Sequence, residues 1–170
     1  MALIALGANL SAPGDGSPLD TCRRAAALLD QSPGARLIGL SRWFETAPVP
    51  ASHQPSYVNA IALLSLGSGP LAAPEALLRH LMGIEARFGR IRGVPNAART
   101  LDLDIIAMRI GDRDVVRSFP DPILPHPRAH ERAFVLAPWA DVASDWRHPV
   151  LGMTPARLLL GLEPQAIRPL

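Results

Sequence analysis

Apolar residues recur along this chain in short segments, and the spacing within the segments switches between that of a strand and that of a helix. Glycine and proline separate the segments, so each one is treated as a single structural element. In chain order, they predict a strand at 3–6, a helix at 18–31, strands at 36–46 and 57–66, a helix at 74–88 and a strand at 101–108. This order is that of the split βαβ, or ferredoxin-like βαββαβ, arrangement. We therefore predict an α+β fold in which an antiparallel four-stranded sheet is covered by helices on one face.

Proline positions define the loops and the end of the domain. The prolines of 48–55 mark a long hairpin connection that cannot join a sheet ladder. Pro74 suits the first turn of the second predicted helix. The prolines of 120–127 exclude regular structure in that stretch. A C-terminal extension follows, with helices expected near 129–140 and 154–161.

The length of 170 residues suits a single domain, 1–170, with one core. No apolar run reaches the roughly 18 residues that a membrane-spanning helix needs. The first residues also lack the basic group that precedes the apolar stretch of a signal peptide. The lone cysteine, Cys22, excludes an internal disulfide framework and fits a reducing compartment. We expect a soluble, cytoplasmic monomer with no membrane partner.

The basic residues restrict the chemistry, because all 17 of them are arginine. Without lysine, neither a P-loop nucleotide site nor a Schiff-base mechanism is possible. Any bound phosphate must be held by arginine, by backbone N–H groups or by a metal ion. A formal net charge of +2 is too small to predict a nucleic-acid partner.

The strongest local pattern is the segment Arg99-Thr100-Leu101-Asp102-Leu103-Asp104. Alternate side chains of a strand point to opposite faces, so Asp102 and Asp104 share one face while the leucines enter the core. Adjacent carboxylates repel each other unless a cation lies between them, and a few hard oxygen ligands suit Mg²⁺ that also binds phosphate oxygens. On this pattern alone, a solvated strand face with two acidic residues remains the alternative.

Arginines beside such a carboxylate pair suit phosphoryl transfer, because that reaction depends mainly on positioning and on neutralised charge. Arg90, Arg92 and Arg99 lie in a glycine-containing segment after the second helix, which we expect to act as a flap over phosphate. Arg87 is interpreted as a solvated residue whose charge suits the C-terminal end of the helix dipole. His126 is fixed between two prolines and is a further candidate.

A set of motifs occurs in order over about residues 3–140. The motifs are Gly7-Ala8-Asn9-Leu10, Thr46-Ala47-Pro48, Tyr57-Val58-Asn59-Ala60, Gly89-Arg90-Ile91-Arg92, the segment 99–104, Pro125-His126-Pro127 and Arg132-Ala133-Phe134-Val135. Together they resemble the 6-hydroxymethyl-7,8-dihydropterin pyrophosphokinase family of folate biosynthesis, for which segment 99–104 is highly specific. The resemblance implies transfer of pyrophosphate from ATP to the hydroxymethyl group of a reduced pterin, with release of AMP.

The resemblance also implies roles for individual residues. Asp102 and Asp104 match the ligands of two Mg²⁺ ions, and Arg90 and Arg99 match catalytic arginines that face the triphosphate. The further ATP contacts would be Arg92, His126, Arg132 and Ile105. The pterin contacts would be Thr46, Pro48, Tyr57, Asn59 and Phe134, with the two aromatic rings enclosing the pterin and the asparagine amide binding its edge. Glu85 matches a family glutamate whose role the sequence does not reveal.

Other functions fit the same order of elements. An RNA-binding module shares it, but such modules expose aromatic residues on the central strands, where this chain carries Asp102 and Asp104. A different magnesium-dependent phosphotransferase, or a hydrolase, would also use the acidic pair. The chain departs from the family at Ala8, where serine is usual, at Pro127, where tyrosine is common, and in the flap, which lacks an Arg-Trp pair.

Overall fold

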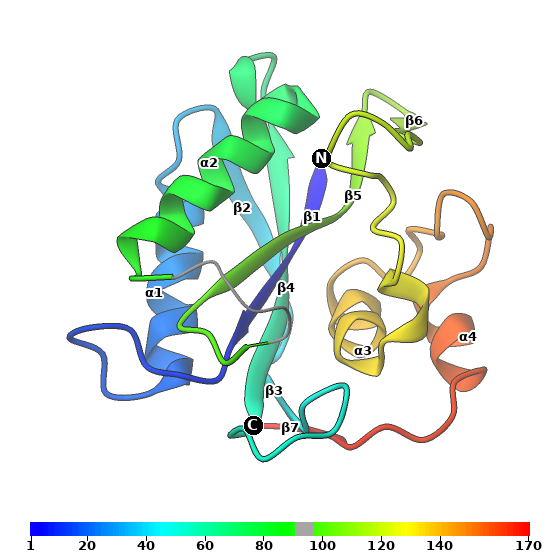
Figure 1. Cartoon of the computed structure of the whole chain (residues 1–170). Helices are drawn as coiled ribbons and strands as arrows, with labels where there is room; N and C mark the ends of the chain where they lie inside the picture. Colours follow the sequence, from blue (N-terminus) through cyan, green and yellow to red (C-terminus); the bar gives the residue numbers. More distant parts are fainter. Residues whose placement is uncertain (91–96) are drawn as a thin grey trace.

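The computed structural model describes residues 1–90 and 97–170, and Arg92, one of the predicted ATP contacts, lies outside these ranges. Figure 1 shows a twisted sheet with helices packed beside it. The strands are β1 (Ala2–Ala8), β2 (Ala35–Leu40), β3 (Phe44–Thr46), β4 (Tyr57–Leu66), β5 (Asp102–Ile110), β6 (Arg113–Asp114) and β7 (Ile167–Pro169). The α-helices are α1 (Pro18–Asp30), α2 (Pro74–Arg87), α3 (Ala133–Val142) and α4 (Pro155–Leu160), with short 3₁₀ turns at Pro70–Ala72 and Ala129–Glu131.

The sheet confirms the predicted fold class. Its strand order is β6-β5-β1-β4-β3-β7, with β2 also paired with β4. The pairs that form the centre, β1 with β4 and β5, and β4 with β2 and β3, are all antiparallel. This centre is the ferredoxin-like arrangement that the order of segments predicted.

The single strand predicted at 36–46 is wrong, because two strands form there. Ser41 N donates to Ile61 O at 3.0 Å, but Ile61 N donates to the Ser41 hydroxyl oxygen, also at 3.0 Å. A side chain thus replaces one backbone partner of the ladder and ends β2. β3 then begins at Phe44 and pairs with the start of β4.

Helices cover both faces of the sheet rather than the single face predicted (Figure 1). Ile4 and Leu64 pack against α1 and α2 in one core. Leu3 and Ile61, which point to the opposite face, pack with Trp139 of α3 and with side chains of α4 in a second core. Because β1 and β4 are apolar on both faces, each face needs a covering layer.

β5 presents a different kind of residue to each face. Its pairing with β1 skips Ile106, which makes a β-bulge. Before the bulge, Leu103 and Ile105 enter the α1–α2 core, and Asp102 and Asp104 lie on the other face, as the alternation predicted. From the bulge on, Ile106 and Ala107 pack in the core beneath α3. The face that α3 covers is therefore apolar at one end and acidic at the other.

Segment ends also follow the prediction. Gly89 ends α2 with a φ of +73°, and Arg90 N donates back to Glu85 O at 3.2 Å. The stretch 120–128 contains no helix or strand beyond the isolated bridge Arg117↔Leu124. β6 and β7 were not predicted. Within the described ranges, no helix has the length and apolar character needed to cross a membrane.

Candidate active site

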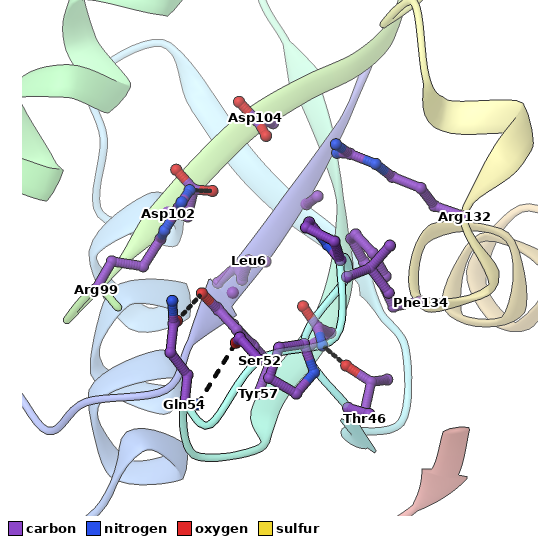
Figure 2. A pocket seen from close by; sticks show the side chains of 17 residues that line it. Leu6, Thr46, Ser52, Gln54, Tyr57, Arg99, Asp102, Asp104, Arg132 and Phe134 are labelled. Atoms are coloured by element: carbon purple, nitrogen blue, oxygen red, sulfur yellow. Dashed lines mark hydrogen bonds and ion pairs between the residues drawn. The ribbon is translucent and has the colours of Figure 1, made fainter. Parts of the chain in front are cut away.

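A cavity of about 310 Å³ opens on the sheet face that carries the acidic pair. β1, β4 and β5 form its floor, β3 and the following loop form one wall, and the start of α3 forms the other (Figure 2). The sequence-predicted residues that line it are Thr46, Pro48, Tyr57, Asn59, Arg99, Asp102, Asp104, Arg132 and Phe134. Candidates for metal, phosphate and pterin binding therefore share one cavity.

Gly7 separates two polar groups on the cavity floor. It pairs with Asn59 on one side and with Asp102 on the other. A Cβ atom at this position would lie 3.1 Å from Asn59 Oδ1 and 3.9 Å from Asp102 Cβ. Because glycine has no side chain, the Asn59 amide oxygen can lie close to the backbone of β1 at this position.

Asp102 is held between two arginines. Arg90 Nη1 lies 2.6 Å from Asp102 Oδ1, and Arg99 Nη1 donates to Asp102 Oδ2. Arg90 also donates to Leu101 O at 2.7 Å. All three charged side chains are mostly buried, so these charge-assisted bonds are strong and well oriented. They fix two positive groups at the edge of the acidic face.

Asp104 has a different environment. Burial, followed by the charges of Asp102 and Glu85, raises the pKa of Asp104 to about 6, against the opposing effect of Arg132 and Arg90. Arg132 extends from the start of α3 toward the acidic face (Figure 2). A further cation beside Asp104 would favour its ionised form.

The donor set fits magnesium. Asp102 and Asp104 supply two carboxylates from one strand face at the cavity. Over residues 1–90 and 97–170, no cluster of three or more His, Cys, Asp or Glu side chains is arranged for a metal. Mg²⁺ is commonly held by one or two carboxylates together with water and phosphate oxygens, whereas structural zinc and calcium sites need more protein ligands.

Glu85 ties α2 to the acidic strand. Its buried carboxylate accepts a hydrogen bond from Leu103 N at 2.9 Å, at the residue between the two aspartates. The same oxygen lies 3.9 Å from Arg90 Nη1. Glu85 therefore positions both the backbone of β5 and one of the arginines that hold Asp102.

The other end of the cavity is built around an amide. Asn59 Nδ2 donates to the Thr46 hydroxyl oxygen at 2.8 Å, and both residues are buried (Figure 2). This bond fixes the orientation of the Asn59 amide, so that Oδ1 lies above Gly7. Tyr57 and Phe134 line the cavity beside this amide. The result is a slot with aromatic rings and an oriented polar edge.

Comparison with known proteins identifies the family of the chain. A family model described as 7,8-dihydro-6-hydroxymethylpterin-pyrophosphokinase (HPPK) matches residues 3–144. The chain belongs to this family. A 2-amino-4-hydroxy-6-hydroxymethyldihydropteridine pyrophosphokinase of Synechocystis sp. is 35% identical over 168 residues, which cover 99% of this chain and 79% of that protein. One of the same name from Pseudomonas aeruginosa is 35% identical and covers 86% of this chain and 82% of its own length.

A solved structure supports the fold alone. The Plasmodium falciparum HPPK-DHPS crystal structure with pteroate matches with a TM-score of 0.54 at 12% identity. The match covers 94% of this chain and 41% of that one.

Among the described residues to which the HPPK resemblance gives a catalytic or ATP-binding role, three lie outside the cavity lining. Arg90 forms an ion pair with Asp102 but does not itself line the cavity. The Ile105 side chain is buried in the α1–α2 core. His126 N donates to Ile106 O at 2.8 Å, and burial, followed by Arg132 and Arg128, lowers the pKa of His126 to about 4. His126 is therefore neutral at physiological pH.

Asn9 belongs to one of the motifs that carry the HPPK resemblance, and the sequence reveals no role for it. In the structure it contacts Arg99 and Gln54, which both line the cavity. Its Oδ1 accepts from Arg99 N at 2.8 Å, and its own N donates to Arg99 O at 3.1 Å. Its Nδ2 donates to Gln54 Oε1 at 3.1 Å and to Pro55 O at 3.3 Å. Gln54 Oε1 also accepts from Tyr57 OH at 3.2 Å. The buried Asn9 amide thus connects Arg99, beside the carboxylates, with Tyr57 through Gln54.

Proposed function

We propose that this chain transfers the pyrophosphoryl group of ATP to the hydroxymethyl group of 6-hydroxymethyl-7,8-dihydropterin, the reaction of its family, and that the cavity described above is where it does so. One observation carries the assignment of the site. On either side of Gly7, a pair of carboxylates and an oriented amide share one cavity. The first suits a metal–triphosphate group, and the second suits the edge of a flat heterocycle.

The acidic end is the proposed ATP side. Asp102 and Asp104 would hold two Mg²⁺ ions, which when bound neutralise the charge of the phosphate oxygens. Arg90 and Arg99 are fixed beside Asp102, where their guanidinium groups can stabilise the charge that develops on the transferred group. Arg132 and His126 would contribute further ATP contacts, together with Arg92 and the backbone near Ile105.

The amide end is the proposed pterin side. Asn59 would hydrogen-bond the ring edge, since Thr46 already fixes the amide by accepting from Nδ2. Tyr57 and Phe134 would enclose the ring faces, and Pro48 would complete the wall. Held this way, the hydroxymethyl group would face the phosphate across Gly7. Alignment of two substrates in this way supplies much of the rate in such a transfer.

Product analysis tests this proposal. The protein is incubated with ATP, Mg²⁺ and the dihydropterin, and nucleotides and pterins are separated by chromatography. We expect AMP and a pterin diphosphate in equal amounts, and no AMP when the pterin is omitted. ADP formation that does not depend on the pterin would instead indicate a hydrolase or another phosphotransferase.

The pterin assignment has its own test in Asn59→Ala. The change removes the edge hydrogen bonds, so binding of the dihydropterin should weaken far more than binding of ATP. Isothermal titration with each ligand separately measures both. Equal losses for the two ligands would show that Asn59 is structural.

We further propose that the chain works as a single-domain monomer in the cytoplasm, with ATP and the pterin as partners and no nucleic acid. The lone cysteine, Cys22, fits a reducing compartment, and the net charge is small. Light scattering after size-exclusion chromatography tests the monomer, and a dimer mass at micromolar concentration would contradict it.

A further inference from the structure

The C-terminal residues lie beyond the part of the chain that the family model matches, yet they contact the cavity wall. β7 pairs antiparallel with β3, the strand that ends at Thr46. Ala47 N donates to Ala166 O at 3.4 Å, and Leu170 N donates to Trp43 O at 2.9 Å. In Figure 1 this tail runs from α4 to the edge of β3. The wall formed by β3 and its loop therefore rests on the tail.

Gln165, next to Ala166 in the chain, holds the opposite wall. Its Oε1 accepts from Ala133 N at 2.9 Å, and its Nε2 donates to Glu131 O at 2.9 Å. The two bonds lie on either side of Arg132. No side chain of α3 itself caps its first turn, so Gln165 supplies the missing acceptor. The backbone that carries Arg132 and Phe134 is thus fixed from the tail.

We propose that residues 165–170 form a brace that sets the distance between the two walls of the pterin slot, and that Gln165 is its positioning residue. Adjacent residues of one chain segment hold both walls: Gln165 holds the start of α3, and Ala166 holds Ala47. The inference rests on the proposed pterin assignment of this slot. The proposal gives residues 165–170, which lie outside the family match, a positioning role in pterin binding.

The physical reason is the steep distance dependence of ring packing. A gap of about 0.5–1 Å between surfaces loses a quarter to a half of the dispersion attraction. A flat ring between Tyr57 and Phe134 is sensitive to the position of the start of α3, whereas a triphosphate is held by several charges at once. Loss of the brace should therefore affect the pterin more than ATP.

The test compares Gln165→Ala, Gln165→Glu and the control Glu163→Ala, which changes an exposed residue of the same tail. Titration calorimetry gives the Kd of the dihydropterin in the presence of a non-hydrolysable ATP analogue, and the Kd of that analogue alone. For Gln165→Ala we expect the pterin Kd to rise roughly three- to tenfold, the scale of one to two net hydrogen bonds. The analogue Kd should stay within about twofold, and Glu163→Ala should match the wild type.

Gln165→Glu separates the two bonds, since it keeps the acceptor for Ala133 N and loses the donor to Glu131 O. Its pterin Kd should lie between those of the wild type and Gln165→Ala. An unchanged pterin Kd in a folded Gln165→Ala protein, or equal losses for pterin and analogue, would overturn the brace. Asn59→Ala, measured in parallel, separates the two proposals. If it also leaves pterin binding unchanged, the slot assignment fails; if it alone weakens binding, only the brace fails.

Discussion

Asp104→Asn is expected to stabilise the protein while it abolishes pyrophosphoryl transfer. The ionised Asp104 is unfavourable in the fold, because burial, then Asp102 and Glu85, raise its pKa from 3.8 to about 6. At about 1.36 kcal/mol per pKa unit, this difference costs the folded state about 3 kcal/mol at pH 7.5. A neutral amide avoids that cost. Its own hydrogen-bonding groups are not fully paired at this position, however, which costs the folded variant about 1–2 kcal/mol. The net gain should be about 1–2 kcal/mol.

The gain should also depend on pH. A carboxyl group whose pKa is higher in the folded state stabilises the fold when protonated, and this contribution is lost as the pH rises from about 4 to about 6. The advantage of Asp104→Asn should therefore shrink between pH 7.5 and pH 5, by about half of the 3 kcal/mol electrostatic cost. Urea denaturation of the metal-free wild type and variant at both pH values measures this directly.

Asp102→Asn is the matched control, since Asp102 lies on the same strand face but is paired. The change removes contacts to Arg90 and Arg99 and leaves two mostly buried guanidinium groups with fewer partners. It should lower the free energy of unfolding by about 1–3 kcal/mol. Turnover at saturating Mg²⁺ should fall about a hundredfold or more in both variants. A destabilised Asp104→Asn protein at pH 7.5, or a pH-independent gain, would refute the electrostatic argument; near wild-type turnover in either variant would refute the metal assignment.

Further predictions concern residues that hold the site in place. Arg99→Lys keeps the charge but cannot contact Asp102 and Ala97 O together, so the single-turnover rate should fall roughly tenfold or more; an unchanged rate would leave Arg99 as a screening charge. Asn9→Ala should lower the same rate, and a double-mutant cycle should show this loss to be much smaller in the Arg99→Lys background; full additivity would contradict the coupling. Glu85→Ala should cost about 1–3 kcal/mol of stability in urea denaturation because it leaves Leu103 N without this acceptor, whereas Glu85→Gln should retain most of it; equal losses would argue against the hydrogen bond.

Local patterns predicted the parts of the fold that depend on neighbouring residues. The alternation in β5 placed Asp102 and Asp104 on one face, because the two-residue period of a strand holds without reference to the rest of the chain. The boundaries of β4 and the start of α2 followed from composition in the same way. Ser41 ended β2 because its hydroxyl replaced a carbonyl, and nothing in the spacing of apolar residues records that substitution.

The position of Glu85 in the sequence is itself a signal of a buried polar contact. Glu85 stands four residues after Leu81 and three before Phe88, on the buried stripe of α2. A charged residue on such a stripe must be paired or hydrogen-bonded, so its position alone predicts a buried partner. The identity of that partner, Leu103 N on β5, depends on how α2 packs on the sheet.

The location of the site along the sheet is a consequence of non-local packing. The sheet face beneath α3 is apolar at Leu3 and Ile61. It becomes polar at Asn59, two residues before Ile61 on β4. α3 covers the first part and begins at the border of the second, where Arg132 and Phe134 enter the cavity. Its starting point is fixed by Gln165, more than thirty residues later in the chain. A local sequence pattern does not record a contact between residues so far apart in the chain. The motifs could therefore identify the chemistry of the site, whereas the width of the cavity depends on how the C-terminal segment packs.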